Sequence, residues 1–360
     1  MQGLSIVVLG LSITSSWGNG HATNYRGLVR ALSERGHRVL FLERDVDWYR
    51  AHRDLPVPPH GRTELYGSFE ELTGRFATEV AQADLVVVGS YVPDGIEVCR
   101  WVTGTAGGIR AFYDIDTPVT LAALDRGDCS YLLAEQLSAF DLYLSFTAGP
   151  TLDLLRQRYG CRRPVAFHCL VDPEAYPQLD EPVRWDLGYL GTYSDDRQPV
   201  LDRLLLEPAR QRPELRFVVA GPQYPPSLDW PANVERIEHL APADHPGFYA
   251  AQRLTLNVTR SDMVRAGWSP SVRLFEAASC GVPVISDRWD GIDAFFVPGE
   301  EILLVDDAAH VVEILDDVGP RRRREIANRA RSRVLAEHTA HARAHQLECM
   351  AFEVMAGAEP

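Results

Sequence analysis

The segment from Arg265 to Pro298 constrains the fold of this chain more than any other stretch. It reads RAGWSPSVRLFEAASCGVPVISDRWDGIDAFFVP. The Ser-Pro-Ser run at 269–271 is typical of a helix start, because Ser caps the first turn and Pro fits it. Val272 to Ser279 has helical apolar spacing, and Cys280-Gly281 ends that pattern. The apolar residues from Val282 to Ser286 then predict a short buried strand, so a helix leads directly into a sheet.

This helix start has the properties of an anion site. A helix that begins after Ser271 offers unpaired backbone N–H groups and the positive end of its dipole, which suits a phosphate group. Glu276 lies one turn further on, where a carboxylate can accept hydrogen bonds from two neighbouring ribose hydroxyls. A solvated surface glutamate is the alternative, since most Glu side chains are exposed. Phe275 and Ala277 flank Glu276 in an otherwise apolar helix, which favours the binding role.

Short apolar runs recur along both halves of the chain, and loops and helical patterns separate them. Continuous apolar runs of this length are typical of strands buried in a parallel sheet. The chain has 360 residues, which is enough for two domains of ordinary size. Asp172 to Glu181 is rich in Pro and acidic residues and predicts a linker. The predicted strands are Ser5–Gly10, Arg38–Glu43, Leu85–Gly89, Ile109–Tyr113, Leu142–Phe146 and Val165–His168 before it, and Asp186–Leu190, Arg216–Gly221, Val234–Ile237 and Leu254–Val258 after it. The predicted helices outside the opening segment are Tyr25–Arg35, Glu70–Ala81 and Pro246–Ala251.

Composition excludes several classes of function. The formal net charge of −14 argues against nonspecific nucleic-acid binding, which usually needs a basic surface. The six cysteines form no Cys-x-x-Cys pair, so neither a zinc ribbon nor a redox dithiol is expected, and a reducing cytoplasm is the expected location. No apolar run reaches about eighteen residues, so we expect no transmembrane helix.

Two segments of the chain resemble a family of enzymes. SPSVRLFEAASCGVPVISDRWDGIDAFFVPGEEILLV resembles the donor-site segment of the glycosyltransferases related to spore-maturation protein CgeB, which are similar to family 4 glycosyltransferases. GNGHATNYRGLVRALSERGHRVLFLERDVDWY resembles the first strand–helix unit of the same group. The resemblance implies an α/β chain with the GT-B fold, two facing, doubly wound Rossmann-like domains with a cleft between them. The expected divisions are an acceptor-side domain at 1–171, a nucleotide-sugar domain at 182–335, and a helix within 336–360 that crosses back to the first domain.

The resemblance also implies roles for residues of the second domain. A glutamate at the position of Glu276 binds the ribose of the nucleotide sugar in that family. The family pattern has a second glutamate eight residues earlier, and here that position is Trp268, so the motif is half present. The remaining expected donor-binding residues lie at the helix start, in a glycine loop and near the donor sugar: Ser271, Val272, Arg273, Gly191, Thr192, Tyr193, Arg197, Gly221, Asp290 and Gly291.

Two stretches of the first domain are further candidates. The loop containing Gly18, Asn19, Gly20 and His21 faces the interdomain cleft in the resembling enzymes, and a plain turn before a helix is an equal alternative. Asp114 and Asp116 follow a predicted strand, where ligand-binding groups of open α/β sheets collect. We interpret both aspartates as catalytic candidates, although capping of the next helix is the alternative for Asp116.

The same Asp-Ile-Asp triplet matches the short pattern that binds a divalent ion in the other glycosyltransferase fold, GT-A. A second Asp-x-Asp occurs at Asp45-Val46-Asp47, so chance matches are easy. The phosphate site is expected instead at the helix after Ser271, where the dipole and the guanidinium groups of Arg273 and Arg197 can neutralise charge. We therefore expect no metal and no cofactor beyond the nucleotide sugar.

The expected activity is transfer of a sugar from a nucleotide-sugar donor to an acceptor. UDP is the expected nucleotide, retention the expected outcome, and a glycan, a natural product or a protein the acceptor. Two other classes stay open at this point. One is a nucleotide-sugar epimerase or hydrolase with the same architecture, and the other is a noncatalytic subunit that binds a sugar nucleotide.

Overall fold

The computed structural model describes residues 3–357 of the chain. The chain divides into two compact units. The first unit comprises Met1–Leu170 together with Ala340–Pro360, and the second unit comprises Val171–Thr339. The segment predicted as a linker, 172–181, is therefore part of the second unit. The closing helix α14 (Ala340–Met355) is part of the first unit, where it packs against α1 (His21–Glu34).

The described residues of the first unit form a seven-stranded sheet with the order β3-β2-β1-β4-β5-β6-β7. Every neighbouring pair in it is parallel, so the carboxyl ends of all its strands lie along one edge. The central strands β1 and β4 are almost wholly buried, as expected of a sheet covered on both faces. The strands are β1 (Ser5–Gly10), β2 (Arg38–Arg44), β3 (Arg62–Tyr66), β4 (Leu85–Gly89), β5 (Ile109–Asp114), β6 (Leu142–Ser145) and β7 (Pro164–Ala166).

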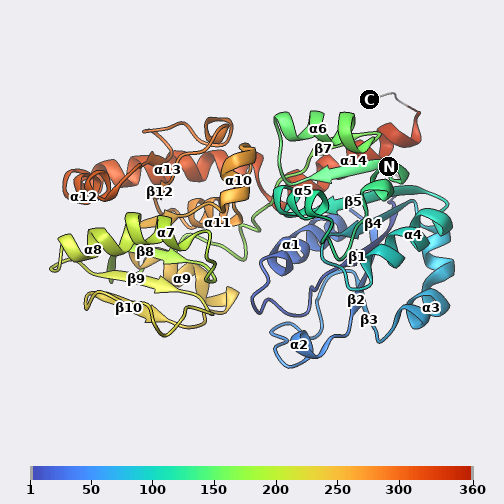
Figure 1. The fold of residues 1–360 in the computed structure, drawn as a ribbon, viewed down its shortest axis with the longest axis horizontal. Helices are drawn as coiled ribbons and strands as arrows, with labels where there is room; N and C mark the ends of the chain where they lie inside the picture. The colour runs from blue at the N-terminus through green and yellow to red at the C-terminus, as the bar shows by residue number, and fades with distance from the viewer. Residues whose placement is uncertain (1–2, 358–360) are drawn as a thin grey trace. The chain divides into compact units, whose positions relative to one another are not determined.

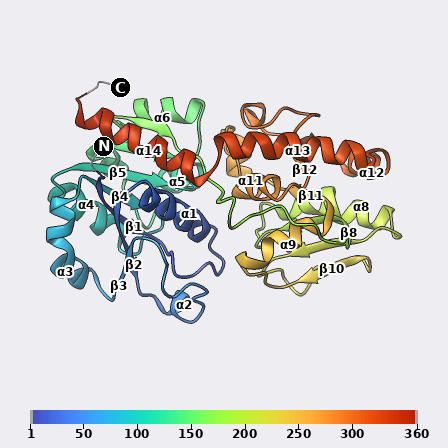
Figure 2. The same ribbon diagram turned by 180° about the vertical axis from the view of Figure 1, so that it is seen from behind.

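Helices cover both faces of this sheet. Figure 2 shows α1 and α14 together in front of the sheet of the first unit. On the other face, α3 packs against α4, as right-handed crossover connections require. The remaining helices connect the strands. Their bounds are α2 (Asp47–Arg50), α3 (Phe69–Gln82), α4 (Gly95–Thr105), α5 (Thr117–Arg126), the 3₁₀ helix η1 (Ala134–Ala139) and α6 (Pro150–Tyr159).

The described residues of the second unit form a six-stranded parallel sheet with the order β10-β9-β8-β11-β12-β13. Figure 1 shows β8, β9 and β10 of this sheet side by side. The chain runs outward from β8 to β10 and then returns to β11 on the other side of β8. Such a reversal of strand order is the point at which open α/β sheets bind ligands. The strands are β8 (Trp185–Leu190), β9 (Phe217–Ala220), β10 (Val234–Ile237), β11 (Gln252–Asn257), β12 (Val284–Ser286) and β13 (Leu303–Leu304).

The helices of the second unit form two groups by their contacts. In one group α12 (Ala308–Asp317) packs against α8 (Glu207–Gln211), and in the other α13 (Pro320–Glu337) packs against α11 (Val272–Ser279). Among residues 3–357, no helix is both long enough and apolar enough to cross a membrane. The other helices are α7 (Gln198–Leu201), the π-helical turn η2 (Asp202–Leu206), η3 (Pro242–Asp244), α9 (His245–Ala250), α10 (Ser261–Ala266) and η4 (Ile292–Ala294).

Candidate functional site

The amino-terminal end of α11 lies at the edge where the strands of the second sheet end. α11 follows β11 through the segment 258–271, and the hydroxyl of Ser271 donates a hydrogen bond to Asn257 Oδ1 at 2.6 Å. Ser271 therefore does not cap the helix with its side chain. Among the described residues, the backbone N–H groups of Val272 and Arg273 have no acceptor, while that of Leu274 bonds to the Ser271 carbonyl. These two free N–H groups, with the helix dipole, can bind phosphate oxygens.

Asn257 holds this helix start in place and was not predicted from the sequence. Its Oδ1 also accepts from Arg273 Nη1 at 2.9 Å, and its Nδ2 donates to Thr259 Oγ1 at 3.1 Å and to Ser286 Oγ at 2.9 Å. Asn257 is fully buried, so these bonds fix its orientation. A polar residue that ends the apolar strand QRLTLN was the available signal.

Arg273 faces the interior of the second unit, and its predicted donor contact stays a prediction. The side chain is buried, and Nε donates to the carbonyl of Leu190 at the end of β8. The guanidinium carbon lies 4.7 Å from the centre of the Tyr189 ring. Gly191 follows directly, and a Cβ there would lie 2.8 Å from Arg273 Nη2. The Arg273 side chain therefore supports the end of β8, and its backbone N–H, at the start of α11, is left without an acceptor among the described residues.

The loop after β8 and the turn after β9 lie side by side. Gly221 has φ +143°, and a Cβ there would lie 2.1 Å from the carbonyl oxygen of Gly191, so only glycine fits. Arg197 Nη2 donates to the Thr192 carbonyl at 2.6 Å, so its guanidinium bonds within its own loop, and its predicted phosphate contact stays a prediction. Tyr193 likewise directs its hydroxyl to Asp195 in the same loop, at 2.6 Å.

Glu276 is buried in the second unit, with 5% of its surface exposed. The hydroxyl of Tyr249 donates to Glu276 Oε2 at 3.4 Å. Burial, and then the nearby Glu276 charge, raise the pKa values of Tyr249 and Tyr176 well above their usual range, so both hydroxyls keep their protons. A carboxylate can accept about four hydrogen bonds, so these tyrosines leave acceptor capacity for a ligand. Neither tyrosine was predicted as part of the site.

Trp268 and Gly291 form one contact. Trp268 has φ +44°, an uncommon conformation for a residue with a side chain, and its N–H donates to the Asp290 carbonyl at 2.6 Å. Gly291 has φ +82°, and a Cβ there would lie 2.4 Å from Trp268 Cδ1. The indole ring therefore occupies the space above Gly291. Asp290 and Gly291, which were predicted to lie near the donor sugar, therefore both contact Trp268, the residue at the sequence position of the first motif glutamate.

In the first unit the structure brings together His21 and Asp116, which were predicted separately. His21 begins α1 after β1, and Asp116 precedes α5 after β5. Asn19 Oδ1 accepts from the His21 backbone N–H at 3.0 Å, which starts the helix four residues before the predicted Tyr25. His21 Nε2 lies 3.6 Å from Asp116 Oδ2, and the two side chains are 11% and 19% exposed. His21 Nδ1 has no hydrogen-bond partner among the described residues. Gly18 and Gly20 flank Asn19 in the turn, and Gly18 has φ +58°.

Asp114, the other predicted catalytic candidate, lies inside the first unit, and its catalytic role stays a prediction. It is fully buried and accepts hydrogen bonds from Tyr143 Oη at 2.6 Å and Thr120 Oγ1 at 2.7 Å. The backbone N–H of Asp116 donates to Asp114 Oδ1 at 3.3 Å. Burial raises the Asp114 pKa to about 6. Asp114 therefore positions the turn that carries Asp116.

This raised pKa predicts a pH dependence of stability. When the pKa of an acid is higher in the folded state, folding takes up a proton between the two pKa values, so the free energy of unfolding falls as pH rises through that window. From the ordinary value of 3.8 to about 6, the loss is of the order of 3 kcal/mol. We expect Asp114→Asn to remove this slope. Urea denaturation of both proteins between about pH 4 and pH 7.5 checks it, and parallel curves would contradict it.

Glu43 organises the loop that leads to His21 and was also missed. It is the last residue but one of the mostly apolar strand β2 and is fully buried. Its carboxylate accepts from the backbone N–H groups of Ile13 at 2.7 Å and Thr14 at 3.0 Å, and from the hydroxyls of Ser12 at 3.1 Å and Thr14 at 2.6 Å. Four bonds to one carboxylate fix the loop after β1 in one conformation. A charged residue at the end of a buried strand was the available signal.

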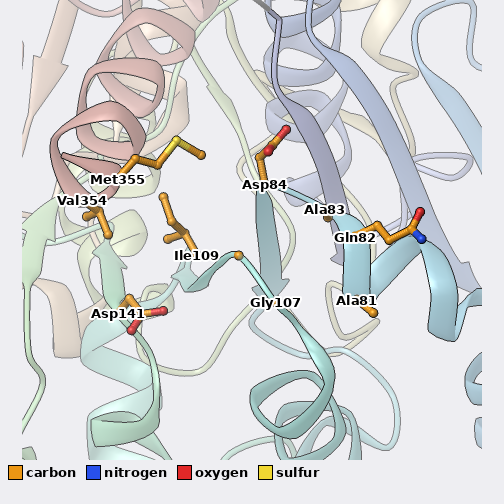
Figure 3. A pocket seen from close by; sticks show the side chains of 10 residues that line it. Ala81, Gln82, Ala83, Asp84, Gly107, Ile109, Asp141, Val354 and Met355 are labelled. Carbon is orange, nitrogen blue, oxygen red and sulfur yellow. The ribbon is translucent and has the colours of Figure 1, made fainter. Parts of the chain in front are cut away.

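A hollow of about 530 Å³ in the first unit lies away from these residues (Figure 3). It is lined by Asp84, Gly107, Gly108, Asp141 and the Val354–Met355 end of α14. Asp84 and Asp141 each immediately precede a strand, so the hollow is at the amino ends of the strands, opposite to the edge with His21. Asp84 accepts a hydrogen bond from Ser5, and Asp141 accepts one from Arg110, so both carboxylates hold neighbouring strands together.

Comparisons with known proteins identify the fold. Residues 197–348 match the model of a family described as glycosyl transferase-like. Sucrose-phosphate synthase from Thermosynechococcus elongatus is similar to this chain with a TM-score of 0.71 and 16% identity, over 99% of this chain and 100% of that one. Anabaena HepE in complex with UDP and glucose has a TM-score of 0.67 and 14% identity, over 96% of this chain and 99% of that one.

The chain has the GT-B fold. This confirms the fold class predicted from the sequence, with two parallel-sheet, Rossmann-like units. An α-glucosyltransferase in complex with UDP-glucose and DNA containing an abasic site is another GT-B neighbour, with a TM-score of 0.71 and 10% identity, over 97% of this chain and 100% of that one. No curated protein sequence matched the chain. At these identities the similarity establishes the fold and leaves the donor, the acceptor and the CgeB-like relationship to be argued from the site.

Proposed function

We propose that the protein is a glycosyltransferase that takes its sugar from a UDP-sugar donor. The observation that carries this proposal is the start of α11, where two free backbone N–H groups precede the buried carboxylate of Glu276 on one short helix. A diphosphate fits the N–H groups and the dipole, and the ribose hydroxyls fit the carboxylate. The match of residues 197–348 to a glycosyl transferase-like family supports it, as does the fold shared with HepE, whose structure holds UDP.

The first unit supplies the acceptor side of the proposed reaction. His21 Nε2 and Asp116 Oδ2 are close enough for the carboxylate to stabilise a protonated imidazole. The pair can accept a hydrogen bond from an acceptor hydroxyl and help to remove its proton as the oxygen bonds to the sugar. The leaving UDP keeps the electron pair of the broken bond, and the start of α11 stabilises its charge. Retention at the anomeric carbon rests on the resemblance to family 4 enzymes, and proton NMR of the product tests it.

Titration with UDP and UDP-glucose is the direct test of the donor site. A ligand that binds only the folded protein raises its stability by mass action, by about 2.7 kcal/mol at a hundredfold excess over the Kd. We expect UDP to raise the Tm and UMP, which lacks the second phosphate, to raise it much less. Equal shifts with UMP and UDP would contradict a diphosphate site at α11.

Removal of divalent metal is expected to leave donor binding and transfer intact. The proposed phosphate groups are stabilised by backbone N–H groups and the helix dipole, and the buried Asp114 already bonds to Tyr143 and Thr120. Complete chelation by EDTA, with UDP binding followed by calorimetry and UDP release by a coupled assay, checks this. Strict dependence on Mn²⁺, restored by adding it back, would contradict a metal-free donor site.

Trp268 favours one alternative, a noncatalytic subunit that binds a sugar nucleotide. Its indole packs over Gly291, and in the resembling enzymes its position in the sequence is a glutamate that lies near the donor sugar. Such a subunit would bind UDP and turn over no donor. A hydrolase or an epimerase would instead act on the donor without any acceptor, releasing free sugar or a changed sugar nucleotide. Analysis of all products formed from UDP-glucose distinguishes these outcomes from transfer.

A further inference from the structure

An aromatic platform stands on the first unit beside the loop that carries His21. We define it as the side chains of Trp17, Trp48 and His52. The rings of Trp17 and His52 are stacked, with centroids 4.5 Å apart and an interplanar angle of 17°. The Trp48 ring is tilted against His52 at 5.8 Å. Trp48 is 53% exposed, whereas every other tryptophan of the chain is buried or half-buried. The three rings contact one another, so the exposed Trp48 belongs to an aromatic cluster and is not an isolated surface residue.

The platform is held rigidly by hydrogen bonds between the segments that carry it. Ser15 Oγ donates to the His52 carbonyl at 2.8 Å, and His52 Nδ1 lies 2.9 Å from the Trp48 carbonyl oxygen. The Ser16 N–H donates to Asp54 Oδ1 at 2.8 Å, and the Arg26 guanidinium binds the Asp54 carboxylate with two nitrogens. A surface fixed in this way loses little conformational freedom when a ligand binds.

The position of the platform relates it to the acceptor side of the proposed reaction. Trp17 lies in the loop after β1, four residues before His21, and Trp48 lies beyond the carboxyl end of β2. Asp116 lies beyond the carboxyl end of β5, on the same edge of the same sheet. β2 and β5 are separated by three strand spacings, which is roughly 14 Å. A ligand that reaches from Asp116 to Trp48 must therefore be longer than a single sugar ring.

The chemistry around the platform fits a neutral saccharide. An aromatic face packs against the C–H face of a pyranose ring, while its polar neighbours bond to the ring hydroxyls. Asp47 and Arg50 are both exposed beside Trp48 and form an ion pair at 2.9 Å, so they offer acceptors and donors. The segment 45–54 holds three aspartates against two arginines, a net charge of −1 with neutral histidine, which does not favour an acidic glycan.

We infer that the platform is an acceptor subsite that stacks against a ring of a neutral oligosaccharide whose reacting end lies at His21 and Asp116. This inference rests on the proposed function for the reaction at that end. It identifies the acceptor as an extended glycan and makes Trp48 a specificity-determining residue.

The test measures saccharide binding directly. Cellotriose, maltotriose, xylotriose and triacetylchitotriose are titrated against the full chain by intrinsic fluorescence and by saturation-transfer NMR. We expect at least one to bind, Trp48→Ala to raise its Kd about tenfold, and Trp48→Phe, which keeps an aromatic face, to stay close to the wild type. Leu154→Ala, at another partly exposed apolar side chain of the first unit, is the control and is expected to change nothing.

The outcomes separate this inference from the donor site. The inference is overturned if none of the four saccharides binds, or if Trp48→Ala binds as tightly as the wild type. It is also overturned if Trp48→Ala changes only binding of a nonsugar aromatic such as p-nitrophenol, or only self-association in sedimentation. UDP affinity, measured on the same variants, should be unchanged. A protein that binds no UDP but binds a saccharide through Trp48 would refute the proposed function and keep the glycan subsite.

Discussion

Replacing Asp116 with Asn is expected to lower the rate of sugar transfer by about 10²- to 10⁴-fold, the usual contribution of general acid–base catalysis. Asp116 Oδ2 lies 3.6 Å from His21 Nε2, and an amide of the same shape cannot stabilise a charged imidazole. The Kd for UDP should stay unchanged, because Asp116 is in the first unit and the proposed UDP residues are in the second. UDP release from UDP-glucose in the presence of the oligosaccharides, together with calorimetry of UDP, measures both quantities.

Two further variants test whether Asp116 acts through His21. His21→Ala should slow transfer to a similar extent, and the double variant should be little slower than either single one, because residues that act as a unit are not additive. Asp128→Asn is the matched control, since the Asp128 side chain pairs with Arg126 at the exposed surface. If Asp116→Asn keeps the wild-type rate, Asp116 only starts α5 and the acceptor group lies elsewhere.

The sequence predicted the strands of both sheets better than it predicted what individual side chains contact. Continuous apolar runs identify buried parallel strands, and β1, β4, β10 and α11 have the predicted bounds. β3 was missed because its sequence, RTELY, is mostly polar and lies at the edge of the sheet. A strand of that kind lacks the apolar run on which the prediction depends.

The candidate site shows why side-chain roles needed the structure. Asp114 and Asp116 are two residues apart and equal in chemistry, yet the first ends β5 inside the sheet and the second stands beyond it. Only tertiary packing distinguishes a carboxylate that meets Tyr143 from one that meets His21. Arg273 is a similar case. Its place in α11 was predicted, but its Nε donates to the carbonyl of Leu190, which belongs to a strand far away in sequence. Local patterns carry no information on such long-range partners.

Replacing Glu276 with Gln is expected to weaken UDP binding by about 10- to 150-fold, the equivalent of losing a charge-assisted hydrogen bond worth about 1.5–3 kcal/mol. Gln tests the ribose contact more specifically than Ala does, because Ala would also leave the buried hydroxyl of Tyr249 without its acceptor. The Gln oxygen can still accept from Tyr249, while its NH₂ group cannot accept from a ribose hydroxyl. The Tm without ligand should therefore change little.

A comparison of ligands shows whether the lost affinity belongs to the ribose. The wild type should bind UDP more tightly than 2′-deoxy-UDP or 3′-deoxy-UDP, and Glu276→Gln should bind all three nearly alike, because the group that distinguishes them is gone. Tyr249→Phe is the control, since it removes a hydroxyl next to Glu276 and leaves the carboxylate. Discrimination between UDP and its deoxy forms that survives in Glu276→Gln would place the ribose elsewhere and leave Glu276 as a partner of the buried tyrosines.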